Sequence, residues 1–180
     1  MIRRRELLGA ALGLLLSPAS AFAFTGARRR LALASDLERS LATSPFVYVS
    51  PLRADGAESA CHGEVWYGWL DGAVVITTRT TTWKARSLAR GLDRARVWVG
   101  DYGRWKRALG RNEAFRAGPS FVASASTVED ARLLDRLLEL YAGKYPDEIG
   151  KWRDRMRQGY ADGSRILIRY RPESAGSSRT

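Results

Sequence analysis

The sequence predicts a single α+β domain that is mainly β, with about six antiparallel strands and flanking helices. Short aliphatic and aromatic runs alternate with turn signals, which is typical of antiparallel strands. Two Asp-Gly pairs, at residues 55–56 and 71–72, separate consecutive runs and predict tight hairpins. Between the later runs, leucines recur at helical spacing. The sequence contains neither a repeat period nor a linker, so one domain is the simplest prediction.

The first 23 residues have the pattern of an export signal. Arg3-Arg4-Arg5 precedes an apolar run from Leu7 to Leu16, and Ala21-Phe22-Ala23 offers a small-x-small cleavage site. The apolar run is shorter than the about 20 residues that a transmembrane helix needs. The order Arg4-Arg5-Glu6-Leu7-Leu8 resembles the twin-arginine signal, which exports proteins that are already folded. An ordinary secretory signal is the alternative.

We therefore expect a signal peptide over residues 1–23, a domain over residues 24–172 and a disordered, Ser/Gly-rich tail over residues 173–180. The expected location is the bacterial periplasm, with no stable membrane span after cleavage. Because Cys61 is the only cysteine and His62 the only histidine, the sequence excludes an intramolecular disulfide and a Cys/His zinc site.

The chain is basic, with a net charge of +11 at pH 7. Arginines are scattered through every segment and interleaved with Asp and Glu. A nucleic-acid interface would concentrate the basic residues on one element, so the sequence argues against nucleic acid as a partner.

The first half of the domain is expected to hold one helix and three strands. The helix ends before Ser44-Pro45, and the two Asp-Gly turns join the strands into an antiparallel meander. The predicted elements are a helix over Arg28–Ala42 and strands over Phe46–Ser50, Ser59–Leu70 and Val74–Thr78.

The second half mixes helices and strands. A capping box at Ser126-Thr127-Val128-Glu129 is expected to begin a leucine-rich helix, and Pro146 to end it. The predicted elements are a helix over Trp83–Arg90 capped by Gly91, a strand over Arg94–Gly100, an irregular stretch over Asp101–Gly118, a strand over Pro119–Ser126, the leucine-rich helix, a helix over Glu148–Gln158 and a last strand over Arg165–Tyr170 that Pro172 stops.

Residues 77–88 are unusually rich in threonine and contain Lys84 between two arginines. Threonine hydroxyls and a lysine ammonium donate to anionic oxygens, and a helix that begins here adds free N–H groups. Such a strand–loop–helix junction suits a phosphate group. Lys84 stands out because the chain uses arginine at nearly every other basic position. The alternative is an edge strand with threonine on its solvated face.

The order of these elements resembles the flavin-binding split β-barrel of the pyridoxamine 5′-phosphate oxidase-like proteins. In that family a strand ends in Thr, a Ser or Thr follows four residues on, and a Lys stands two residues beyond. Thr78, Thr82 and Lys84 occupy those positions. The resemblance covers about Pro45 to Pro172 and rests on order and spacing, which are less specific than a phosphate-binding glycine loop.

The resemblance implies a six-stranded antiparallel split barrel that forms a homodimer and binds FMN. It further implies an oxidoreductase that passes hydride or electrons from a small-molecule or redox-protein donor. The phosphate is expected on Thr78, Thr82 and Lys84, and the ring along strand 64–67. The expected cofactor-binding residues are Trp66, Tyr67, Thr77, Thr78, Thr82, Trp83 and Lys84.

The sequence departs from the family pattern at two cations. Trp83 stands where an arginine often precedes the lysine, and Glu64 lies where the long strand often carries a phosphate-binding arginine. Arg79 or Arg86 would have to compensate. The alternatives are therefore deazaflavin or haem in place of FMN, a non-catalytic haem- or flavin-binding or sensing protein of the same fold, or a cofactor-free basic periplasmic module. If haem is bound, His62 is the candidate ligand. No catalytic acid or base is identified.

Overall fold

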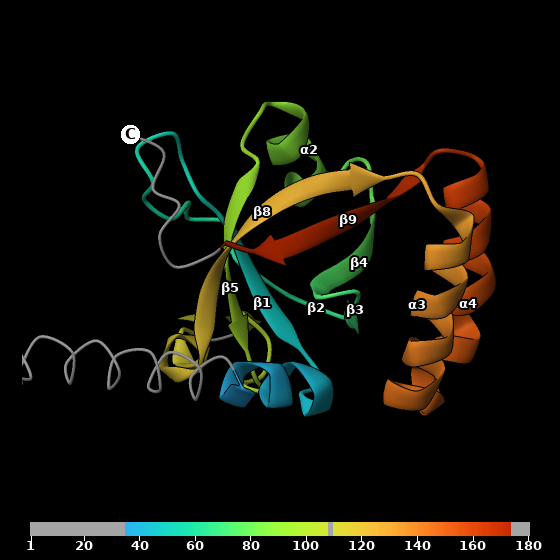
Figure 1. Ribbon diagram of the computed structural model, residues 1–180, viewed down its shortest axis with the longest axis horizontal. Helices are drawn as coiled ribbons and strands as arrows, with labels where there is room; N and C mark the ends of the chain where they lie inside the picture. Colours follow the sequence, from blue (N-terminus) through green and yellow to red (C-terminus); the bar gives the residue numbers. More distant parts are fainter. Residues whose placement is uncertain (1–34, 108–109, 174–180) are drawn as a thin grey trace, which may run out of the picture. The chain divides into compact units, whose positions relative to one another are not determined.

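In the computed structural model, residues 35–107 and 110–173 are described. Their main feature is a seven-stranded antiparallel sheet with the strand order β2-β1-β5-β8-β9-β4-β3 (Figure 1). The expected signal peptide and the end of the expected tail lie outside the described residues. The seven strands are β1 Val47–Pro51, β2 Gly63–Val65, β3 Gly68–Leu70, β4 Ala73–Arg79, β5 Arg94–Val99, β8 Ser120–Val128 and β9 Arg165–Pro172.

The helices and a small hairpin complete the described residues. Residues 35–43 are helical, which confirms the last part of the first predicted helix. None of the described helices is long and apolar enough to cross a membrane. The remaining elements are α2 Trp83–Ala89, α3 Ala131–Lys144, α4 Pro146–Ala161, the 3-10 helix η1 Ala114–Ala117, and the hairpin of β6 Lys106–Arg107 and β7 Gly110–Arg111.

The strand predicted over Ser59–Leu70 is broken into two, which corrects the expected six strands to seven. β2 pairs with β1 and β3 pairs with β4, so the two pieces form the opposite edges of the sheet. At the break, the Tyr67 N–H donates to the Tyr145 hydroxyl, and the Tyr141 hydroxyl donates to the Trp66 carbonyl. These hydrogen bonds to side chains replace the backbone hydrogen bonds that a neighbouring strand would make. Since only two residues separate the edges, the sheet curls on itself as a split barrel.

Both Asp-Gly turns are confirmed. Asp71 and Gly72 have φ of 53° and 68°, the left-handed pair that a two-residue hairpin turn requires. Gly56 has φ of 79°, and the Arg53 N–H donates to the Ala57 carbonyl across the other turn. The chain therefore reverses where the sequence predicts.

The expected capping box is wrong. β8 continues to Val128 because Ser126 and Val128 keep pairing with β9. Asp130 caps α3 instead, and its carboxylate accepts the Leu133 N–H at 3.0 Å. Pro146 does end the leucine-rich helix, and it begins α4, where its missing N–H costs no helical hydrogen bond.

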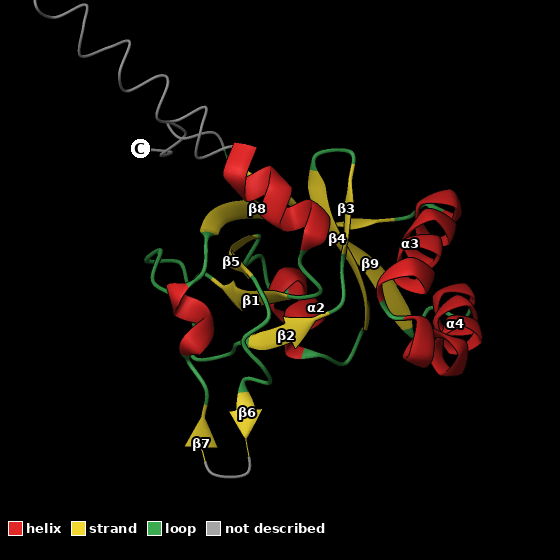
Figure 2. Ribbon diagram, turned by 90° about the horizontal axis from the view of Figure 1, so that it is seen from below, coloured by secondary structure: helices red, strands yellow, loops and turns green. Residues whose placement is uncertain are grey.

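The sheet separates two hydrophobic layers. Helices α3 and α4 lie together on one side of the strands (Figure 2). Alternation on β4 sends Val74 and Ile76 into the barrel interior and Val75 toward these helices. β9 alternates in the same way, with Ile168 inward and Leu167 outward. Four leucines of α3 are buried against this outer face: Leu133, Leu134, Leu137 and Leu138. Each such side chain contributes about 1.5–3 kcal/mol through burial.

A third, smaller cluster lies beside β1 and β5. Phe115 of η1 stacks on Tyr48 with ring centroids 4.8 Å apart, and Trp98 and Trp105 complete the cluster. The described residues of the irregular stretch predicted over 101–118, which leave out 108–109, form loop, the two short strands β6 and β7 and a short 3-10 helix, as expected. After β9, Glu173 receives two hydrogen bonds from Arg94, so the first residue of the expected tail is held on the barrel.

Candidate functional site

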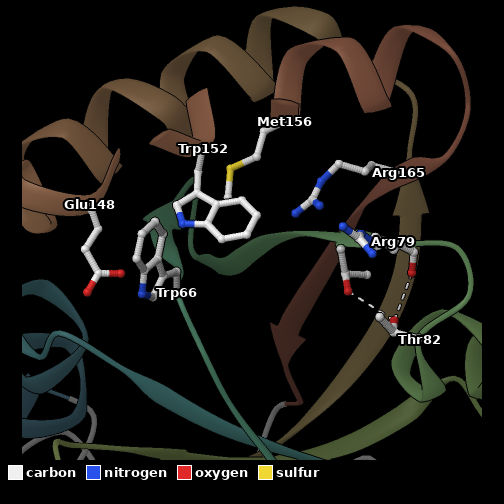
Figure 3. Close-up of a pocket in the computed structure, with 8 residues that line it drawn as sticks. Trp66, Arg79, Thr82, Glu148, Trp152, Met156 and Arg165 are labelled. Atoms are coloured by element: carbon white, nitrogen blue, oxygen red, sulfur yellow. Dashed lines mark hydrogen bonds between the residues drawn. The ribbon is translucent and has the colours of Figure 1, made fainter. Parts of the chain in front are cut away.

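A cavity of about 410 Å³ lies where β4 ends, between the β4–α2 junction and α4 (Figure 3). We call it the junction cavity. Its volume is within the range of small-molecule sites. Its polar lining comes from Thr78, Arg79, Thr82, Glu148 and Arg165, and its apolar lining from Trp66, Trp152 and Met156.

Two threonine hydroxyls meet at one end of the junction cavity. The Thr78 and Thr82 oxygens lie 3.1 Å apart, although only 6% of Thr78 is exposed. Thr82 is the N-cap of α2, and its oxygen accepts the Ala85 N–H. β3 pairs with β4 only at Ala73–Val75, so Thr77 and Thr78 pair with β9 alone, but the burial of Thr78 places it away from a solvated face.

Two arginines flank the hydroxyls. Arg79 and Arg165 are paired in the register of β4 and β9. Within the described residues, neither guanidinium has a carboxylate at ion-pair distance. Burial and the charge of Arg79 lower the pKa of Arg165, and its buried Nε has no hydrogen-bond partner in the described part of the chain. Two guanidiniums without an anion are unfavourable unless a ligand supplies one.

The other end of the junction cavity is aromatic and acidic. Trp66 is fixed by stacking on Tyr145, with ring centroids 4.2 Å apart and an interplanar angle of 10°. Trp152 and Met156 come from α4, at the helical spacing that places both on one face. In Figure 3 the Glu148 carboxylate lies beyond Trp66, on the side away from the arginines. The cavity thus has a basic end, an apolar middle and an acidic end.

Three of the seven predicted site residues line this cavity: Trp66, Thr78 and Thr82. Tyr67 does not, because it is 0% exposed and its hydroxyl donates to the Leu41 and Ser44 carbonyls. Thr77 points to the opposite face of β4 from Thr78, and its buried oxygen has no partner among the described residues.

Trp83 and Lys84 lie against β2 and are absent from the cavity lining. A Cβ at Gly63 would come within 3.1 Å of the Trp83 ring and 3.8 Å of the Lys84 Nζ. The Lys84 ammonium lies 4.4 Å from the Trp83 ring centroid, and burial lowers its pKa to about 8. In the described residues it has no acidic partner.

The sequence did not single out Arg165, Glu148, Trp152 or Met156 as site residues. Arg165 reaches the site through strand pairing, and the other three reach it through the packing of α4. Of the two arginines named as possible replacements for the missing cations, Arg79 lines the cavity and Arg86 does not. The one sequence signal for these residues was the i, i+4 spacing of Trp152 and Met156. That spacing is as typical of a helix face packed in the core as of one that lines a ligand site.

His62 lies outside the junction cavity, in the aromatic cluster. Its ring is 4.8 Å from Trp105 and 5.6 Å from Phe115, and its Nε2 is 3.2 Å from a nitrogen of Arg116. Burial, followed by the charge of Arg116, lowers its pKa. In the described residues no group of three or more His, Cys, Asp and Glu side chains could hold a metal ion.

The sequence matches no family model and no curated protein. The structure is similar to several solved structures. HutZ, the heme storage protein from Vibrio cholerae, has a TM-score of 0.53 at 16% identity, covering 79% of this chain and 92% of its own. A conserved hypothetical protein from Mycobacterium tuberculosis has a TM-score of 0.54 at 22% identity, covering 78% and 80%.

A proposed pyridoxamine 5′-phosphate oxidase from Listeria innocua has a TM-score of 0.50 at 14% identity, covering 79% of this chain and 94% of its own. These similarities confirm the fold. The chain has a split-barrel fold of the pyridoxamine 5′-phosphate oxidase-like type.

Proposed function

We propose that the protein binds FMN in the junction cavity and acts as an exported flavin-dependent oxidoreductase. The observation that carries the proposal is the pair Arg79 and Arg165, which converge beside two threonine hydroxyls without a carboxylate in the described residues. A phosphate dianion would neutralise both guanidiniums. It would also accept hydrogen bonds from Thr78 and Thr82.

The rest of the cavity suits a flat ring that carries a polar edge. Trp66, Trp152 and Met156 offer apolar and polarisable surface for such a ring. The isoalloxazine ring carries an imide N–H, and a carboxylate accepts a hydrogen bond from such a donor. Glu148 is therefore the residue that we assign to the ring edge.

In this assignment the chain positions the cofactor and tunes its charge. The flavin, when bound, supplies hydride or electron transfer. Arg79 and Arg165 hold the phosphate end, the two tryptophans exclude water from the ring, and Glu148 orients the pyrimidine edge. Arg79 and Arg165 also replace the two cations that are missing from the family pattern, so that Lys84 is not required as the phosphate ligand.

The haem alternative is less well supported by the geometry. His62 is enclosed by Trp98, Trp105 and Phe115 and does not line the junction cavity. The cavity lining includes the Met156 thioether, but it includes no histidine or cysteine. Haem would therefore have to bind without the axial ligands most used for it in proteins.

The test is the visible spectrum of the protein together with an FMN titration of the apoprotein. We expect a two-banded flavin spectrum and saturable binding, which Arg165→Met should weaken more than tenfold. Arg157→Met is the matched control, because Arg157 pairs with Asp135 and lies outside the cavity. Equal affinity in the wild type and Arg165→Met would overturn the assignment of the phosphate site, and a Soret band would favour haem.

We also propose that the mature protein is a periplasmic homodimer, as the resemblance to flavin-binding split barrels implies. Size-exclusion chromatography with light scattering should give twice the mass of the mature chain. A monomer that retains FMN would contradict the dimer proposal while leaving the cavity assignment intact.

A further inference from the structure

A second depression adjoins the junction cavity along α4. We call it the α4 groove. It has a volume of about 450 Å³, and it shares Arg79, Trp152 and Arg165 with the junction cavity. Arg155 and Gln158 extend it along the helix. A ligand anchored between the two shared arginines can therefore continue from the junction cavity into the groove.

The groove is positively charged. Arg155 is exposed, has no carboxylate at ion-pair distance in the described residues, and holds its guanidinium 5.5 Å from the Trp152 ring centroid. One acidic residue, Asp162, lines the groove, but its carboxylate accepts the Ser164 N–H at 2.8 Å. Three arginines thus face one carboxylate that is already hydrogen-bonded.

The position of Arg165 is fixed by the backbone. A Cβ at Gly159 would lie 2.7 Å from the Cγ and Cδ of Arg165, so the aliphatic part of the arginine packs directly on the helix there. Arg165 lines both depressions, so its guanidinium lies at their boundary. The Arg165 charge can therefore interact with an anionic group in the junction cavity or in the α4 groove.

We propose that the α4 groove binds an adenylate, either as the distal half of FAD or as a free adenine nucleotide beside FMN. Arg155, with the shared arginines, neutralises the second phosphate. The Trp152 indole, which lines both depressions, offers a stacking surface for a base. The Gln158 amide supplies both a donor and an acceptor for the edge of adenine. The inference rests on the proposed function for the flavin half.

The experiment compares FMN and FAD on the apoprotein, and then titrates AMP into the FMN-loaded protein. FAD is expected to bind at least about tenfold more tightly than FMN, since a charge-assisted contact supplies that much affinity. Arg155→Met should abolish the preference and leave FMN binding unchanged. Arg157→Met, two residues along the same helix and paired with Asp135, is the control for lost charge.

Each outcome is informative. A preference for FAD that depends on Arg155 supports the dinucleotide. Equal binding of FMN and FAD, with AMP binding to the FMN-loaded protein through Arg155, supports the free nucleotide. FMN binding without either effect overturns the inference and leaves the proposed function standing. If no flavin binds, the proposed function fails; AMP binding that depends on Arg155 then supports the groove, and its absence overturns it.

Discussion

The hydroxyl of Thr78 donates to that of Thr82, whose own proton goes to the Arg79 carbonyl at 2.9 Å. The two hydroxyls therefore form a short chain of hydrogen bonds that ends on the backbone. Both residues also line the junction cavity. A hydroxyl rotates about its C–O bond, so each can turn its proton to an anion, at the expense of the bond that it makes without one.

We expect Thr78→Val to weaken FMN binding by about three- to tenfold, because the bond of about 1.5–3 kcal/mol to the charged phosphate is made at the expense of the neutral bond of about 0.5–1.5 kcal/mol to Thr82. The loss is modest since Thr78 exchanges one partner for another. Fluorescence titration measures it, with Thr43→Val on the exposed face of helix 35–43 as the control. An unchanged affinity would remove Thr78 from the site.

Thr82→Ala should destabilise the fold, whereas Thr82→Ser should not. Thr82 is the N-cap of α2, and losing such a cap costs about 1 kcal/mol. The midpoint of urea unfolding, measured without flavin, separates this cost from any effect on binding. If both variants unfold at the same midpoint, the cap does not contribute to stability.

Arg165→Met should weaken FMN binding without destabilising the apoprotein. Replacing a half-buried charge that lies beside Arg79 by an apolar side chain of similar length should leave the unfolding free energy of the apoprotein unchanged or raise it by about 1 kcal/mol. FMN binding should weaken more than tenfold. Arg165→Lys, which keeps the charge, is the conservative control. A strongly destabilised Arg165→Met would indicate a structural role for the guanidinium.

Lys84 predicts a stability change at alkaline pH. Burial lowers its pKa to about 8 in the fold, whereas an unfolded lysine titrates near 10.4. Between these values the unfolded chain binds more protons, so the free energy of unfolding rises with pH. We expect the wild type to gain stability over Lys84→Met as the pH increases from about 8 to about 10. If the unfolding free energies of the wild type and Lys84→Met change in parallel with pH, the Lys84 ammonium is not buried in the fold.

His62 predicts a loss of stability in acid. It is 6% exposed, and burial and Arg116 lower its pKa, while Glu58 and Glu113 partly oppose them. As the pH falls below about 6.5, the unfolded chain takes up the proton first, so folding becomes less favourable. Urea unfolding at pH 7.5 and pH 5.5 should show a larger loss for the wild type than for His62→Gln. Equal losses would assign the acid effect to other groups.

Local signals in the sequence predicted most of the fold. The Asp-Gly turns, the strands β5 and β9 and the break at Pro146 depend on residues close together in the chain, and the structure confirms each of them. Two errors arose where tertiary contacts override local pattern. Trp66 and Tyr67 look like the middle of one strand, but tyrosines of α3 and its C-cap bind their backbone. Ser126 looks like a helix cap, but pairing with β9 keeps it extended.

The site was less predictable, for a physical reason. Thr78 and Thr82 belong to one junction, so their spacing alone brings them together. Arg165 joins Arg79 only because β4 and β9 pair, and no property of either arginine in the sequence indicates this. Conversely, Lys84 has the residue type and the spacing of a phosphate ligand, but its ammonium lies beside Gly63 of β2 and away from the junction cavity.

The pairing of β4 with β9 has a consequence for assembly of the holoprotein. β9 is the last strand in the described part of the chain, and one of its two partners, β4, lies much earlier in the sequence. Such long-range pairing carries a large loop-closure entropy and forms slowly. A nascent chain that lacks β9 contains Arg79 and α4, but it lacks Arg165 and the strand that pairs with the end of β4. Cofactor capture should therefore follow folding rather than guide it, and flavin fluorescence would report the moment when the chain is complete.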